Sequence, residues 1–217
     1  MVELLHAGPA DAQVMLLLAH GAGAPMTSPF LETMARLLAD RAIATARFEF
    51  GYMAARRQGG KRRPPPKAET LCEEYLAAVE ATAATLRPSQ RLLIGGKSMG
   101  GRVASLVAGA LHMSRAVAGL VVLGYPFHPP AKPEQLRTAH LVDLACPTLI
   151  VQGERDPFGA RTEVAAMRLS TRIVFHWASD GDHDLGPRGG SGFTRKGNLA
   201  AAADAVGAFA QASNAAT

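Results

Sequence analysis

Cysteines and long apolar runs are scarce in this sequence of 217 residues. Cys72 and Cys146 are too few for a disulfide framework, and neither lies in a spacing typical of a metal site. The longest apolar run, residues 14–19, is far shorter than the about 20 residues that a membrane-spanning helix needs. Residues 1–13 lack the basic start and the apolar stretch of a signal peptide. We therefore expect a soluble, cytoplasmic protein with no membrane partner.

Positive charge is spread unevenly along the chain. Residues 56–67 (RRQGGKRRPPPK) hold six of the 23 basic residues and no acidic residue. Without these six charges the formal net charge of +5 becomes −1. The chain as a whole therefore lacks the basic surface of a nucleic-acid-binding protein, and the segment has no aromatic side chain on which bases could stack. Nucleic acid is not an expected partner.

Apolar patterning predicts alternating strands and helices. Continuous apolar runs, typical of strands buried on both faces, occur at residues 14–19, 44–50, 91–94, 117–123, 148–151 and 172–175. Helical spacing occurs at residues 29–41, 68–86, 99–113, 161–169 and 198–212. The alternation predicts an α/β fold: one domain over residues 1–217, with a mostly parallel sheet of about six to seven strands and helices on both faces. Residues 56–67 are too proline-rich for a helix or a central strand and are predicted to form a loop.

The sharpest motif is G-K-S-M-G at residues 96–100. It fits G-x-S-x-G, the nucleophile elbow of α/β-hydrolases, in which a serine sits on a strained turn between a strand and a helix. Ser98 is therefore the candidate nucleophile. The alternative is the end of a phosphate-binding loop of a nucleotide-binding protein, but that loop needs a glycine where Arg91 stands.

Small residues follow the predicted strand at 14–19. They do not match a dinucleotide fingerprint, because Met26 stands where its third glycine is needed. They suit an oxyanion hole, in which backbone N–H groups face a developing negative charge. We assign the two donors to the N–H groups of Ala22 and Met99. His20 precedes the serine and is interpreted as a residue that braces this loop.

A candidate acid and a candidate base follow the serine, each in a loop after a later strand. Asp156 follows the strand at 148–151, and His183 lies in the Gly/Asp loop after the strand at 172–175. Nucleophile, acid and histidine follow in that order in α/β-hydrolases. The histidine would take the serine proton and the carboxylate would orient the histidine. We expect no metal and no organic cofactor.

Several longer strings strengthen this interpretation. They are HGAGAPMTSPF (20–30), RRPPPK (62–67), GGKSMGGR (95–102), GYPFHPP (124–130), QGERDPFG (152–159) and DGDHDL (180–185). In these strings the chain resembles the KANL/testis-expressed hydrolase-like branch of the α/β-hydrolase superfamily, among the small serine hydrolases similar to dienelactone hydrolase. The resemblance implies one compact domain and a triad of Ser98, Asp156 and His183. Because some animal relatives act as scaffolds, it also leaves a non-catalytic interaction protein as the alternative function.

The predicted activity is hydrolysis of a carboxylic ester or thioester, with a small acyl compound as the partner. The basic segment 56–67 is either a solvated loop or a cationic flap that favours anionic substrates. Candidate substrate-binding residues are Arg62, Arg63, Lys97 and His128. The connection at 124–141 stands where a lid could lie, and its shortness predicts an open, shallow pocket.

Replacing Arg62 and Arg63 by alanine is expected to raise KM for an anionic ester more than for a neutral ester of the same acyl length. The reason is that a cationic flap attracts only the anion. Steady-state kinetics with the two esters test this, and equal effects on both would eliminate the flap.

Overall fold

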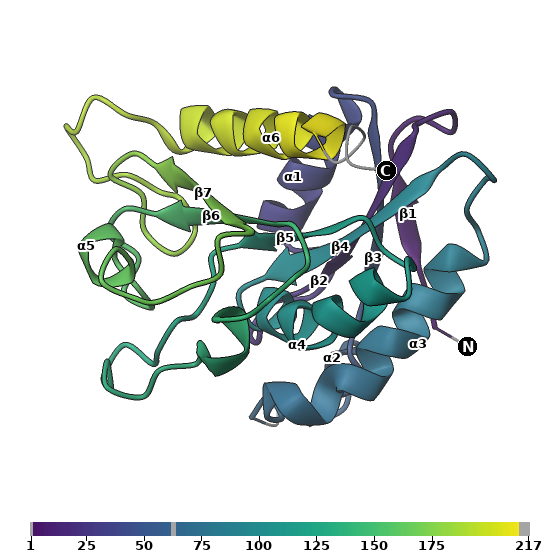
Figure 1. Cartoon of the computed structure of the whole chain (residues 1–217), viewed down its shortest axis with the longest axis horizontal. Coiled ribbons are helices and arrows are strands. Elements are labelled where there is room, and N and C mark those ends of the chain that lie inside the picture. The colour runs from purple at the N-terminus through teal and green to yellow at the C-terminus, as the bar shows by residue number, and fades with distance from the viewer. Residues whose placement is uncertain (1, 62–63, 213–217) are drawn as a thin grey trace.

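The structure, a computed structural model, describes residues 2–61 and 64–212. Seven strands form one sheet in the order β1-β3-β2-β4-β5-β6-β7 (Figure 1). The strands are β1 (Leu5–Ala7), β2 (Val14–Ala19), β3 (Ile43–Phe48), β4 (Arg91–Lys97), β5 (Gly119–Leu123), β6 (Thr148–Gly153) and β7 (Ile173–Ala178). Only the short edge strand β1 runs antiparallel to its neighbour among these pairs. The expected mostly parallel sheet is therefore confirmed.

Helices cover both faces of this sheet (Figure 1). They are α1 (Pro29–Ala39), α2 (Gly51–Arg57), α3 (Cys72–Ala83), α4 (Met99–Met113), α5 (Arg161–Val164) and α6 (Arg195–Ala212), with single 3-10 turns at η1 (Ala68–Leu71) and η2 (Ala139–Leu141). Helices α1 and α6 pack together on one face, and α3 and α4 lie on the other. No helix in the described part of the chain is long and apolar enough to cross a membrane.

The continuous apolar character of the central strands follows from this layering. In β2, Leu16 and Leu18 face the cluster that contains α1 and α6, whereas Met15 and Leu17 face the cluster that contains α3 and α4. Successive side chains of a strand point to opposite faces, so a strand with helices on both sides needs an apolar residue at every position.

The largest differences from the sequence predictions concern three elements. Strand β1 was not predicted, because three half-buried or exposed residues carry no apolar run. Helix α2 was not predicted either, and its last turn enters the basic segment that was expected to be a loop from residue 56. Helix α5 stops at Val164, well short of the predicted 161–169. Val164 is the only buried residue of α5, and residues 165–169 are exposed or half-buried. Packing against the core therefore does not stabilise a longer helix.

The order of the strands determines where a site can form. From β2 the chain first adds β3 on one side and then returns to add β4 on the other. Loops that follow parallel strands emerge at one edge of the sheet, and the crevice beside such a reversal is where α/β folds bind ligands. The segments after β2, β4, β6 and β7 therefore meet at the carboxyl edge.

Tyr75 of α3 links a helix to the central strand β4. It is fully buried, and its hydroxyl donates to the carbonyl of Gly95 at 2.8 Å while it accepts the Gly95 N–H at 2.9 Å. Burial raises the pKa of Tyr75, so the phenol remains protonated and able to donate.

Tyr75→Phe is expected to lower the free energy of unfolding by about 1–3 kcal/mol, because two buried backbone groups lose a partner. Urea unfolding should show a lower midpoint with an unchanged slope. Tyr52→Phe is the control: its half-buried hydroxyl donates to one carbonyl, that of Ala22, so a smaller loss is expected. A wild-type midpoint for Tyr75→Phe would contradict this account.

Candidate active site

Ser98 occupies the tight turn between β4 and α4. Its backbone has φ +51° and ψ −116°, a conformation that residues with a side chain rarely adopt. Two glycines make the turn possible. A Cβ on Gly96 would lie 2.7 Å from the Ala19 carbonyl oxygen, and one on Gly100 would lie 2.5 Å from that of His20. Only glycine therefore allows the end of β4 and the start of α4 to pass this close to the end of β2.

The structure brings together Ser98, His183 and Asp156, which come from three separate loops at the carboxyl edge. Nε2 of His183 lies 2.8 Å from Oγ of Ser98, and Nδ1 of His183 lies 2.7 Å from Oδ2 of Asp156. The serine is partly exposed, the histidine side chain is 20% exposed and the carboxylate is fully buried. A substrate can thus reach the Ser98 hydroxyl but not the Asp156 carboxylate.

Asp156 is held by more than the imidazole. Its Oδ1 accepts the backbone N–H of Phe158 at 2.9 Å, and its Oδ2 accepts Nε2 of Gln152 at 3.0 Å. Gln152 also bonds both backbone polar groups of Tyr125. Gln152 was not among the residues predicted from the sequence, although a glutamine at the end of the apolar run of β6 is a usable signal, since a buried amide needs partners.

His183 lies in a loop that is anchored at both ends. Nδ2 of Asn198 donates to the carbonyls of Ser179 and Leu185, and Asp180 binds Arg155 and Arg188. Hydrogen bonds from Arg188 lower the pKa of Asp180 to about 2, so this carboxylate is charged over the pH range in which proteins are stable. The imidazole also packs against the ring of Phe158, with 4.4 Å between ring centroids.

The loop after β2 lies against the serine. A Cβ on Gly21 would be 3.7 Å from Cβ of Ser98. His20 is fully buried: its Nδ1 lies 2.7 Å from the Gly21 carbonyl, and its Nε2 accepts the Phe50 N–H at 3.1 Å. The proton is therefore on Nδ1. Because the peptide is planar and trans, the N–H of Ala22 points away from the carbonyl that His20 holds.

A second hydrogen bond restrains the same loop from α2. The hydroxyl of Tyr52 donates to the carbonyl of Ala22 at 3.0 Å. On the other side of Ser98, Met99 is the first residue of α4, and N–H groups in a first helical turn have no acceptor within the helix. The two amides assigned to an oxyanion hole thus belong to backbone that flanks Ser98 on both sides.

Two of the four candidate substrate-binding residues lie in the part of the chain that the structure describes. Arg62 and Arg63 lie outside the described residues. His128 is only 3% exposed, and its Nδ1 lies 3.0 Å from the Pro129 carbonyl. Lys97 is 7% exposed, and its ammonium group contacts the protein's own His183 loop. Both side chains are therefore turned into the protein, and their contact with substrate stays a prediction.

A second serine–histidine pair occurs in the fold. Oγ of Ser105 lies 2.8 Å from Nε2 of His140. Ser105 is 2% exposed and lies on the buried side of α4. Burial lowers the pKa of His140 to about 4, which makes it a weak base. This pair is out of reach of a substrate and supports packing.

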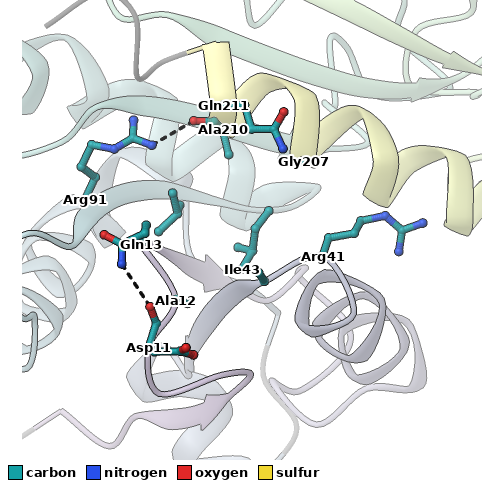
Figure 2. A pocket seen from close by; sticks show the side chains of 11 residues that line it. Asp11, Ala12, Gln13, Arg41, Ile43, Arg91, Gly207, Ala210 and Gln211 are labelled. Atoms are coloured by element: carbon teal, nitrogen blue, oxygen red, sulfur yellow. Dashed lines mark hydrogen bonds between the residues drawn. The ribbon is translucent and has the colours of Figure 1, made fainter.

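Two cavities lie at the opposite, amino edge of the sheet. One, of about 220 Å³, is bordered by the first residues of β2, β3 and β4 and by the end of α6. Figure 2 shows Arg91 in it, pointing to the end of α6, where it donates to the Ala210 carbonyl. The other, of about 450 Å³, lies beside β1 and residue Arg87. Neither is lined by a residue of the site around Ser98. In the described part of the chain, no group of three or more His, Cys, Asp and Glu side chains is arranged to hold a metal ion.

Comparison with known proteins identifies the family of this chain. A family model described as an alpha/beta hydrolase domain matches residues 12–211. The chain belongs to the α/β-hydrolase family.

Solved structures share the fold of this α/β-hydrolase. Dienelactone hydrolase from Anabaena variabilis is 20% identical, with 97% of this chain and 91% of that one covered and a TM-score of 0.72. An α/β serine hydrolase homologue from Coxiella burnetii is 20% identical, covering 85% and 84%, with a TM-score of 0.67. An α/β serine hydrolase without a lid from Xanthomonas campestris is 19% identical, covering 85% and 81%, with a TM-score of 0.65.

The buried His20 gives this α/β-hydrolase a pH-dependent stability. Burial lowers the pKa of His20 from 6.5, so the unfolded chain takes up the proton first as the pH falls. Stability is therefore retained above about pH 6.5 and lost as the pH falls below it. In the His20→Gln variant, the slope of unfolding free energy against pH below 6.5 should be shallower by up to one proton, about 1.4 kcal/mol per pH unit. Denaturant titrations at several pH values measure both slopes, and parallel slopes would contradict the prediction.

Proposed function

We propose that this protein is a serine hydrolase that cleaves a carboxylic ester or thioester through an acyl-enzyme on Ser98, with His183 as general base and Asp156 as the orienting acid. One observation carries the proposal: an unbroken hydrogen-bonded chain runs from the Ser98 hydroxyl through the imidazole to the buried carboxylate. Membership of the α/β-hydrolase family supports hydrolase chemistry in general.

In the first half of the reaction, Oγ of Ser98 attacks the acyl carbonyl carbon while Nε2 of His183 takes the hydroxyl proton. The carbonyl oxygen gains the negative charge, and the N–H groups of Ala22 and Met99 stabilise it. When the tetrahedral intermediate collapses, the bond to the alcohol or thiol breaks. His183 returns the proton to that leaving group, and the acyl group remains on Ser98.

In the second half, water attacks the acyl carbonyl and gives its proton to His183. Collapse of the second intermediate releases the carboxylic acid, and Oγ of Ser98 recovers the proton. Throughout, Asp156 keeps the Nδ1–H tautomer and stabilises the imidazolium. Because Gln152 and the Phe158 N–H also hold the carboxylate, it stays in place when the imidazole charge changes.

The proposed substrate class follows from proteins of similar fold and from the connection at 124–141. Relatives of known fold include a dienelactone hydrolase, an esterase domain from Rhodothermus marinus and a serine hydrolase without a lid, and these support a small or medium acyl compound in an open site. The 124–141 connection is tied down, since the His128 N–H donates to the Phe158 carbonyl and the Arg137 N–H donates to that of Phe127. We also propose that the chain belongs to the KANL/testis-expressed branch and that the basic segment 56–67 acts as a cationic flap that favours anionic substrates.

Labelling with a fluorophosphonate probe tests the nucleophile. We expect the wild type to be labelled and Ser98→Ala to be unlabelled, because the probe reacts only with a serine that a base activates. Ser105→Ala is the matched control, since it removes the other histidine-bonded serine, and it should label like the wild type.

Hydrolysis of p-nitrophenyl acetate by the same three proteins completes the test. Activity lost in Ser98→Ala and retained in Ser105→Ala would support the acyl-enzyme. A folded wild type that neither labels nor hydrolyses the ester would instead favour the non-catalytic interaction protein.

A further inference from the structure

Lys97 is the last residue of β4 and precedes Ser98 in the chain. Its side chain is 9% exposed and its Nζ lies 5.2 Å from the centroid of the Phe30 ring in α1. A lysine in such a place is unusual, because taking an ammonium group out of water has a large free-energy cost unless it is paired. Burial lowers the pKa of Lys97, and Asp184, Asp156 and Asp182 oppose that shift.

The ammonium group reaches across the site to the loop of the histidine. Nζ donates to the backbone carbonyl of His183 at 2.8 Å, and it lies 3.3 Å from Oδ1 of Asp184. The first contact is made to the residue that carries the imidazole itself. One side chain therefore connects the strand that ends in the serine to the backbone of the histidine.

Gly124, which follows β5, shows how closely these groups are packed. Its φ is +72°, and a Cβ there would lie 3.2 Å from Nζ of Lys97 and 3.3 Å from Cε1 of His183. The ammonium group and the edge of the imidazole thus border the same small space. A larger residue at this position would push against both.

We infer that Lys97 is a positioning residue that holds the His183 loop so that Nε2 stays within hydrogen-bond reach of Ser98 Oγ. The effect of Lys97 on catalysis rests on the proposed function. The contact of its ammonium group with the His183 loop is present whether or not the protein is a hydrolase. The positioning role differs from the sequence expectation that Lys97 binds substrate. A binding residue would act on KM, whereas a positioning residue acts on kcat.

The test uses Lys97→Met, which keeps most of the side-chain volume and removes the charge and the donor. Kinetics with p-nitrophenyl acetate are measured per active site, with the active sites counted by fluorophosphonate labelling. We expect kcat to fall about 10- to 100-fold, as small misplacements of catalytic groups do, with KM within about twofold of the wild type. Lys132→Met, which removes an exposed lysine, is the matched control and should leave both constants unchanged.

Two kinetic results would overturn the inference. If kcat per labelled site matches the wild type and only thermal stability falls, Lys97 supports folding alone. If KM for an anionic ester rises while kcat is kept, Lys97 binds substrate after all.

Hydrogen exchange over residues 180–188 separates this inference from the proposed function. Lys97→Met should exchange several-fold faster there than the wild type, whether or not the protein hydrolyses an ester. A wild type that does not label at Ser98, together with faster loop exchange in the variant, would reject the proposed function and keep the hold by Lys97. Unchanged exchange would reject the hold.

Should Lys97→Met fail to fold, Asp184→Asn tests the ion pair from its exposed end, since the Asp184 side chain is 56% exposed. A roughly 2- to 5-fold fall in kcat is expected, the effect of losing a weak ion pair, with faster exchange of the same loop. Wild-type values of both would overturn the inference. Where both single variants fold, the double variant should lose no more than Lys97→Met, because the two side chains act through one contact.

Discussion

The turn at Ser98 is the constraint on which the rest of the site depends. A positive φ at a serine persists only where the surrounding packing leaves no alternative. Gly96 and Gly100 meet that requirement by letting the turn press against the carbonyls of Ala19 and His20 at the end of β2. The same close approach sets the loop after β2 beside Ser98. The close packing of β4 and α4 against the end of β2 therefore accounts both for the strained backbone of Ser98 and for the position of the loop after β2.

Support for the other two side chains comes from polar groups in the interior. The carboxylate of Asp156 is fully buried, and such a group is tolerated because three N–H donors surround it: the imidazole, the amide of Gln152 and the backbone of Phe158. The His183 loop is fixed in the same manner, by Asn198 and by the arginine pairs of Asp180. A buried polar network that is well satisfied is rigid, and rigidity is what proton transfer over one hydrogen bond requires.

Two serine–histidine pairs in this fold have the same distance of 2.8 Å but differ in their surroundings. The pair at Ser98 is partly exposed and ends in a carboxylate, whereas Ser105 lies on the buried side of α4 and burial lowers the pKa of its partner His140. Access for a substrate and an acid behind the base separate the two. Both properties depend on where the fold places each pair, and neither can be inferred from the serine–histidine distance.

Apolar runs and glycine spacing in the sequence were enough to predict the layered α/β architecture and the strand–turn–helix at Ser98, because both depend on local pattern. Strand β1 and helix α2 escaped prediction, since short elements at an edge owe their form to neighbours. Gln152 and Lys97 needed the tertiary structure: whether a polar side chain on a strand turns to solvent or into the core depends on which loops return to its end. The burial of His128 also needed the tertiary structure, because it depends on segments distant in the chain, such as the loop whose Phe158 carbonyl accepts the His128 N–H.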